Sequence, residues 1–217
     1  MEELEKETRA YAFEMRAGND EKNGDNVTGT PIVFGSRTDL GWYDEVIERG
    51  ALDKTDLKDV RFLVNHNTDG IPLARSRNNN ENSTMQMKVT EDGMDIRVNL
   101  DTKDNAEAKS LYSAISRGDV SGMSFMFTVR SDKWENLDSD HPTRRILDIG
   151  KVYEVSAVTW PAYEATTIQA RSKDALDRAK AALESARAEQ EEARMKALEA
   201  EIEARERELH LLELTTL

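Results

Sequence analysis

The chain has 217 residues, 38% of them hydrophobic and 34% charged, which allows one domain of about 150 residues with a hydrophobic core plus polar appendages. A formal net charge of -13 argues against a general nucleic-acid binder, the absence of cysteine excludes disulfides and thiol chemistry, and three scattered histidines argue against a structural zinc site. No apolar run approaches the about 18 residues of a membrane helix, and the amino terminus is acidic, so we expect a soluble protein of a reducing cytoplasm, without a secretion signal or membrane contact.

The first fifty residues predict a β-hairpin followed by a short helix. Residues 11–15 alternate apolar and polar side chains as a strand does, and the apolar run 32–34 follows the polar segment 18–26, so the two runs form a hairpin with a loose loop. The apolar residues within 40–47, with Gly50 as a C-cap, indicate a short helix.

The middle of the chain predicts strands. The apolar run 60–64 is bounded by polar turn residues and indicates a buried strand that ends at Asn65 and His66. Segments 84–89 and 94–100 alternate around a short acidic turn with glycine, which favours a β-hairpin.

A helix and two further strands follow. The helix is capped at residue 104 or 105 and ends near Gly118, and a strand is expected over 120–129. Segment 131–145 is polar and is expected to be a surface loop. Residues 146–159 alternate as a strand and carry Glu154 on a mainly apolar face, where a carboxylate costs free energy unless it has a partner.

From Ser172 to about Leu214 the composition changes to Ala, Glu, Arg, Lys and Leu without Gly or Pro, which predicts one long helix. Its apolar residues form two short heptad seams, composed of Leu176, Ala179, Leu183 and Ala186, and of Leu198, Ile202, Leu209 and Leu212. Gln190 and Arg205 interrupt them, so we expect a weak coiled coil or a transient helical partner, which a second copy of the chain can supply.

The segment from Gly118 to Phe127 holds the candidate nucleophiles. Ser121 and Ser124 flank Gly122 and Met123 at the start of an apolar run, and a serine becomes a nucleophile only beside a base. Among the histidines at 66, 141 and 210, only His66 has the setting of a positioned base, because it follows a buried strand. On these residues alone, a structural histidine and a turn serine remain open alternatives.

Three separated motifs carry a resemblance to a known family. They are Asn65-His66 after a hydrophobic strand, the run from Ser121 to Phe125, and the run from Glu154 to Tyr163; the stretch from Gly41 to Ala51 adds to them. In this order they resemble the prohead proteases of tailed bacteriophages, a family distantly related in fold to the herpesvirus capsid-assembly proteases. The resemblance covers about residues 28–171.

The resemblance implies a catalytic triad. Ser124 matches the family's nucleophile, His66 its general base, and Glu154 the acid that orients the imidazole and stabilises its charged form. Ser121 is the alternative nucleophile and Asp148 the alternative acid. For Glu154, a structural ion pair with Arg61 is the other interpretation.

The expected architecture is an α+β domain over residues 1–171, built on a mainly antiparallel, closed or nearly closed β-barrel with a few packed helices, and a charged helical extension over 172–217. The implied function is a serine endopeptidase, with no cofactor and no metal, that works in the host cytoplasm inside the assembling procapsid. Its implied partners are the major capsid protein with its scaffolding segment, and the protease itself through autocleavage. The alternative is a non-catalytic scaffolding protein that acts through its coiled coil.

Overall fold

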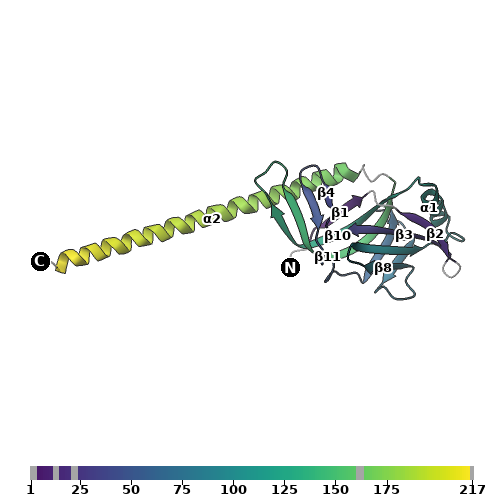
Figure 1. Ribbon diagram of the computed structural model, residues 1–217, viewed down its shortest axis with the longest axis horizontal. Helices are drawn as coiled ribbons and strands as arrows, with labels where there is room; N and C mark the ends of the chain where they lie inside the picture. Colours follow the sequence, from purple (N-terminus) through teal and green to yellow (C-terminus); the bar gives the residue numbers. More distant parts are fainter. Residues whose placement is uncertain (1–3, 12–14, 21–23, 160–163, 216–217) are drawn as a thin grey trace. The chain divides into compact units, whose positions relative to one another are not determined.

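The computed structural model describes residues 4–11, 15–20, 24–159 and 164–215. The chain divides into two compact units, Met1–Lys173 and Asp174–Leu217. The described part of the first unit contains two β-sheets, helix α1 and the first residues of helix α2 (Figure 1).

The larger sheet of the described residues has seven strands in the order β1-β10-β11-β5-β4, with β6 pairing to β11 and β7 to β6. Its longest strand, β11, pairs in parallel with β5 along its first residues and with β6 along its last. The strands are β1 (Lys6–Tyr11), β4 (Arg37–Asp39), β5 (Asp44–Ile47), β6 (Asp59–Val64), β7 (Ala74–Arg77), β10 (Gly122–Glu135) and β11 (Thr143–Val158).

The smaller sheet is antiparallel, in the order β2-β3-β9-β8. Its strands are β2 (Arg16–Asp20), β3 (Gly24–Val33), β8 (Met85–Val89) and β9 (Gly93–Asn99). The predicted hairpin of 84–89 and 94–100 is therefore confirmed. The hairpin near the amino terminus also exists as β2 and β3, but its polar residues 18–20 and 24–26 are strand rather than loop; most of the expected strand at 11–15 lies outside the described residues.

Both sheets share one hydrophobic core. The cluster joins Val27 and Ile96 of the smaller sheet with Phe125 and Val155 of the larger one, and with Leu111 of α1 (Ala106–Arg117). The helix ends follow from the sequence as predicted. The Asn105 side chain accepts hydrogen bonds from the backbone N–H groups of residues 107 and 108, and Gly118 takes a left-handed conformation with φ 79°.

The expected β-barrel is wrong. Both sheets are open, and over the described residues the strand order of neither sheet returns to its first strand. The reason is that β11 accepts two short parallel neighbours on one side, and β3 pairs with β9 to make a separate sheet instead of continuing the larger one. The fold is α+β with two packed sheets.

Two local expectations also fail, for the same reason of long-range pairing. Residues 44–47 are strand β5 instead of a helix, because they pair in parallel with Thr143–Ile146 of β11 and antiparallel with β4. Segment 131–145 is a loop only over residues 136–142, because Ser131–Glu135 pair with residues 143–148 and extend the hairpin of β10 and β11.

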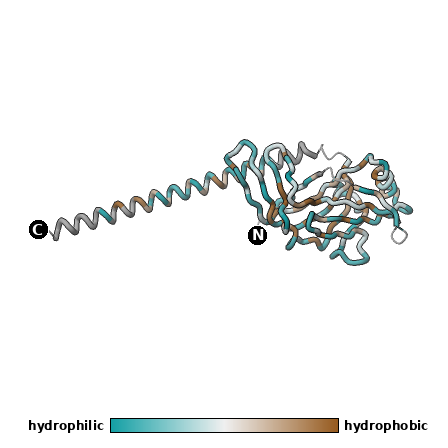
Figure 2. The backbone as a smooth tube through the Cα atoms, viewed as in Figure 1, coloured by the Kyte–Doolittle hydropathy of each residue, from teal (hydrophilic) through white to brown (hydrophobic). Residues whose placement is uncertain are grey.

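Helix α2 runs from Glu164 to Thr215, so it begins before residue 172, and its residues from Asp174 onward make up the described part of the second unit. Its sequence is mostly hydrophilic with isolated hydrophobic residues (Figure 2). Met195, Leu198 and Ile202 are about half exposed, at 48%, 49% and 51%. In the described part of the chain, neither helix has an apolar stretch long enough to cross a membrane.

Candidate active site

Three adjacent strands position the predicted site residues. β10 carries Ser124, β11 carries Glu154, and His66 lies two residues after the end of β6. β11 lies between the other two, with Ser156 opposite Ser124 and Glu154 opposite Arg61. The sheet thereby brings together side chains that are far apart in the sequence.

The three side chains form a continuous hydrogen-bonded chain. His66 Nε2 lies 2.6 Å from Ser124 Oγ, and His66 Nδ1 lies 2.5 Å from Glu154 Oε1. Ser124 is fully buried and Glu154 is 2% exposed, so the ion pair or hydrogen bond between imidazole and carboxylate is shielded from water. Since an ionised carboxylate only accepts hydrogen bonds, Glu154 favours the His66 tautomer that carries its proton on Nδ1 and turns its Nε2 lone pair to Ser124.

The turn after β6 aims the imidazole. Asn65 and His66 both have positive φ values, 50° and 55°, a conformation that is uncommon outside glycine and costs about 1–3 kcal/mol. Contacts with the end of β11 hold it: Asn65 N donates to Ala157 O at 2.9 Å, and Asn65 Oδ1 accepts from Thr159 N at 3.0 Å. The backbone strain is therefore located at His66, the candidate base, and at the residue before it.

Ser156 adds a contact that sequence reasoning missed. Its hydroxyl accepts from His66 N at 3.1 Å and donates to Glu154 Oε2 at 2.5 Å. One buried hydroxyl thus links the backbone of the histidine to the carboxylate that binds its ring. The signal available in the sequence was only the position of Ser156 on the same strand face as Glu154.

The alternative residues lie elsewhere. Ser121 precedes β10 and is exposed. Asp148 forms an ion pair with Arg130, one terminal nitrogen of which lies 2.8 and 2.9 Å from the two carboxylate oxygens. Arg61 contacts Asp59 at 3.4 Å, while Glu154 is bonded to His66 and Ser156.

Strand β1 lies along β10 at the serine. Ala10 is opposite Ser124 and Arg9 is opposite Phe125. Ser124 Oγ is 2.8 Å from the carbonyl oxygen of Arg9, so its single proton has two acceptors within reach, this oxygen and His66 Nε2.

A buried charge cluster anchors β1, and no sequence pattern pointed to it. Arg9 binds Glu45 through two hydrogen bonds of 2.5 and 2.6 Å, and Arg144 binds Glu7 through two of 2.7 and 2.9 Å. Arg144 also binds Asp132 at 2.5 Å. Burial alone would raise the pKa of Glu7, but the charges and hydrogen bonds of Arg9 and Arg144 outweigh it and lower this pKa to about 2.

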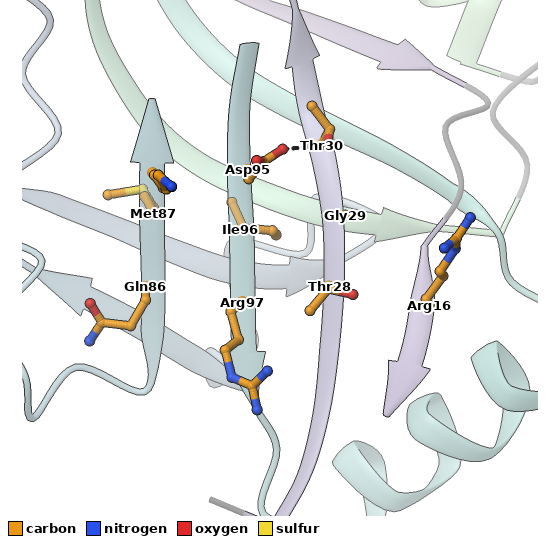
Figure 3. A pocket seen from close by; sticks show the side chains of 10 residues that line it. Arg16, Thr28, Gly29, Thr30, Gln86, Met87, Asp95, Ile96 and Arg97 are labelled. Carbon is orange, nitrogen blue, oxygen red and sulfur yellow. Dashed lines mark hydrogen bonds between the residues drawn. The ribbon is translucent and has the colours of Figure 1, made fainter. Parts of the chain in front are cut away.

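Two other places were candidates for a site. A pocket of about 640 Å³ lies on the smaller sheet, where Arg16 of β2 and Asp95 and Arg97 of β9 lie on either side of β3 and Asp95 accepts from Thr30 at 2.6 Å (Figure 3). Its lining residues include no nucleophile beside a base. A smaller pocket of about 220 Å³ is lined by Glu154 and Met126 and therefore adjoins the triad.

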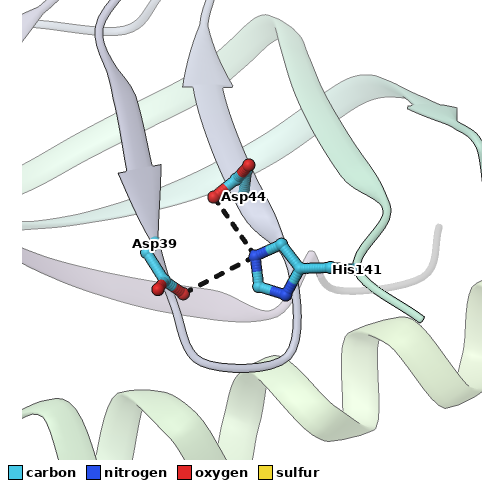
Figure 4. A group of neighbouring side chains, drawn as sticks. All are labelled: Asp39, Asp44 and His141. Atoms are coloured by element: carbon cyan, nitrogen blue, oxygen red, sulfur yellow. Dashed lines mark hydrogen bonds and ion pairs between the residues drawn. The ribbon is translucent and has the colours of Figure 1, made fainter. Parts of the chain in front are cut away.

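His141 lies in a surface cluster with two carboxylates. Its Nε2 is 3.2 Å from Asp44 Oδ1 and 3.7 Å from Asp39 Oδ1 (Figure 4). Arg37 already binds Asp44 at 2.6 Å, so the charge of that carboxylate is shared with a guanidinium. These contacts are those of an exposed ion-pair group. The side chain of His210 lies outside the described part of α2.

Comparison with known families gives one match. The model of the family described as caudovirus prohead serine protease matches residues 12–180, a range that includes Ser124, His66 and Glu154. The chain matches none of the curated proteins and none of the solved structures with which it was compared. Because the family model covers more than half of the sequence, the chain belongs to the caudovirus prohead serine protease family.

Proposed function

We propose that the protein is a serine endopeptidase of procapsid maturation that cleaves with Ser124, His66 and Glu154. The observation that carries this proposal is the unbroken chain of short contacts from Ser124 Oγ through the imidazole to Glu154 Oε1, at 2.6 and 2.5 Å. Membership of a serine protease family supports the same chemistry.

Each residue has a defined role in the proposed reaction. Ser124 Oγ adds to the substrate carbonyl carbon while its proton passes to His66 Nε2, and His66 then gives this proton to the leaving amine. Glu154 keeps the imidazole in the required tautomer and stabilises its protonated form. Ser156 and Asn65 are positioning residues, because they hold the carboxylate and the turn.

The proposed substrates are the scaffolding segment of the major capsid protein and the protease itself, inside the assembling procapsid in the host cytoplasm. Residues 1–171 act as the protease domain and 172–217 as the extension. The half-exposed Met195, Leu198 and Ile202 on α2 suit a tether to helical scaffolding segments or to a second copy of the chain, which encloses protease and substrate at high effective concentration.

Co-expression with the capsid protein of the same phage tests the proposal. Wild type and Ser121→Ala are expected to shorten the capsid protein, whereas Ser124→Ala leaves it full length, as gel electrophoresis and intact-mass measurement will show. Circular dichroism confirms that both variants fold. Processing by Ser124→Ala, or its loss in Ser121→Ala alone, contradicts the assignment.

A further inference from the structure

Strand β1 lies along the edge of β10 at the candidate nucleophile. It pairs antiparallel with β10 along Lys6–Tyr11, and Ser124 Oγ lies 2.8 Å from the carbonyl oxygen of Arg9. The carbonyl carbon is one bond of about 1.2 Å from that oxygen, so the Arg9–Ala10 peptide bond is beside the nucleophile. Ser124 has no exposed surface, which means that a peptide from solution reaches it only after β1 leaves.

The side chain of Arg9 lies in a buried site, called here the arginine pocket, that is formed by Glu45, Arg144 and Phe127 and suits a cation. Its guanidinium binds Glu45, which is 1% exposed, through two parallel hydrogen bonds, and it lies 5.5 Å from the ring centre of Phe127. A bidentate guanidinium–carboxylate pair of this kind is specific in geometry as well as charge. If Glu7 and Arg9 are removed, Glu45 and Asp132 remain opposite Arg144 alone, so the pocket keeps an acidic excess.

A second contact recognises the residue two positions earlier. Glu7 lies on the same strand face as Arg9 and binds Arg144 through two hydrogen bonds. Peptides that add a strand to a sheet gain affinity from backbone pairing and specificity from alternate side chains, and Glu7 and Arg9 are such alternate side chains.

Strand β1 lies before the range that the family model matches. The matched range begins at residue 12, after β1 ends at Tyr11, whereas Ser124, Glu45 and Arg144 all lie inside it. Glu45 and Arg144 thus lie within the matched range, and β1 lies before it.

We propose that the edge of β10 is a binding site for extended peptides with the sequence Glu-x-Arg, that Glu45 selects the arginine and Arg144 the glutamate, and that β1 is the first such substrate, cleaved after Arg9. This inference rests on the proposed role of Ser124. It adds the substrate class and the residues that determine it.

The cleavage follows the triad chemistry. Ser124 Oγ adds to the carbonyl carbon of Arg9 as its proton passes to His66 Nε2, the bond to Ala10 N breaks, and Ala10 N takes the proton. Water then adds to the carbonyl carbon of the ester, one water proton passes through His66 to Ser124 Oγ, and Arg9 leaves as a carboxylate. The product peptide departs with β1, and the site opens to other chains.

The same three-residue pattern recurs in the chain at Glu14–Arg16, Glu192–Arg194 and Glu203–Arg205. The last two lie in α2, where the helix must unwind before the segment can pair with β10. Glu7–Arg9 is already extended and paired, so cleavage after Arg9 comes first.

The test uses the full-length chain in five forms: wild type, Arg9→Lys, Arg9→Gln, Glu45→Gln and, as a matched control, Glu48→Gln. Glu48 is a neighbouring glutamate that pairs with Arg145 away from β1. Intact-mass spectrometry and amino-terminal sequencing follow the appearance of a chain that begins at Ala10. A fluorophosphonate, which reports an active Ser124 without using the arginine pocket, is added to each sample after incubation.

Wild type and Glu48→Gln are expected to yield the chain that begins at Ala10, and Arg9→Lys, which keeps the charge but not the two parallel hydrogen bonds to Glu45, should yield it more slowly than wild type. Arg9→Gln and Glu45→Gln should yield it about 10- to 100-fold more slowly, the effect of losing a hydrogen bond to a charged group. The processed wild type should prefer a synthetic peptide of residues 4–15 with Arg over the same peptide with Gln at position 9. Processed Glu45→Gln should lose this preference.

Two different failures are distinguishable. A fluorophosphonate adduct on Ser124 without any chain beginning at Ala10, or with the Arg preference unchanged in Glu45→Gln, overturns this inference and leaves the proposed protease intact. If the full-length chain gives neither the adduct nor Ser124-dependent cleavage at any bond, a chain produced to begin at Ala10, in which β1 no longer covers Ser124, is tested as well. An adduct on Ser124 in that chain overturns only the inference, whereas absence of the adduct and of Ser124-dependent cleavage there too overturns the proposed function and the inference together.

Discussion

Glu7 offers a quantitative test of how β1 is held. Its carboxylate is 18% exposed and lies between Arg9 and Arg144, which lower its pKa from 4.5 to about 2. At 1.36 kcal/mol per pKa unit, this difference is worth about 3 kcal/mol of stability. Because the folded-state pKa is depressed, this contribution is complete above about pH 4.5 and is lost as the pH falls toward 2.

The substitution Glu7→Gln removes the charge and keeps the shape. In a Ser124→Ala background, which prevents self-cleavage, it is expected to lower the free energy of unfolding at pH 7 by about 3 kcal/mol, and the gap should close between about pH 4.5 and 2. Urea denaturation measures both values without adding salt. Glu48→Gln, at a part-exposed ion pair, should change stability by less than about 1 kcal/mol. If Glu7→Gln is as stable as its parent at pH 7, or if the gap between them stays constant down to about pH 2, the reasoning is refuted.

Three further outcomes are expected. Glu154→Gln should keep the fold but lower the rate of peptide cleavage by about 10⁴-fold, because the carboxylate that stabilises the imidazolium is lost. If Asp148→Asn loses this activity and Glu154→Gln keeps it, Asp148 is the acid of the triad. Ser156→Ala should reduce kcat by about 10- to 100-fold by freeing Glu154 from a charged hydrogen bond, and a change in KM alone would exclude the positioning role. Deletion of residues 174–217 should leave a folded domain that still cleaves a short peptide but enters procapsids poorly. The protease content of purified particles measures this, and a normal content would show that α2 is not a tether.

Local signals predicted the fold where sequence neighbours decide the structure. Asn105 and Gly118 delimit α1 through caps that need no distant partner. Residues 60–64 form a buried strand, as predicted, because a short apolar run between polar turn residues is typical of a strand in a core. The approach of His66 to Ser124 and Glu154 was expected from motif resemblance, and the structure adds the turn at Asn65 that aims the ring.

Distant pairing explains what could not be predicted. Residues 44–47 became strand β5 because β11, about 100 residues later, offers a parallel edge, and no property of the segment itself reveals that partner. The polar residues 131–135 are strand for the same reason. The contact between Arg9 and Glu45 could not be predicted, because charged residues usually indicate an exposed surface. Their burial depends on the contact that they make with each other across two strands.

The most direct test measures which residue reacts with a fluorophosphonate, and how the rate depends on His66, in chains produced without residues 1–9, so that β1 does not cover Ser124 and no variant needs to process itself. Peptide mapping by mass spectrometry is expected to find the adduct on Ser124 in wild type and in Ser121→Ala, and His66→Ala should slow its formation by at least about 10²-fold, since general-base assistance contributes about 10²–10⁴. An adduct on Ser121, or an adduct on Ser124 that forms equally fast without His66, contradicts the central claim.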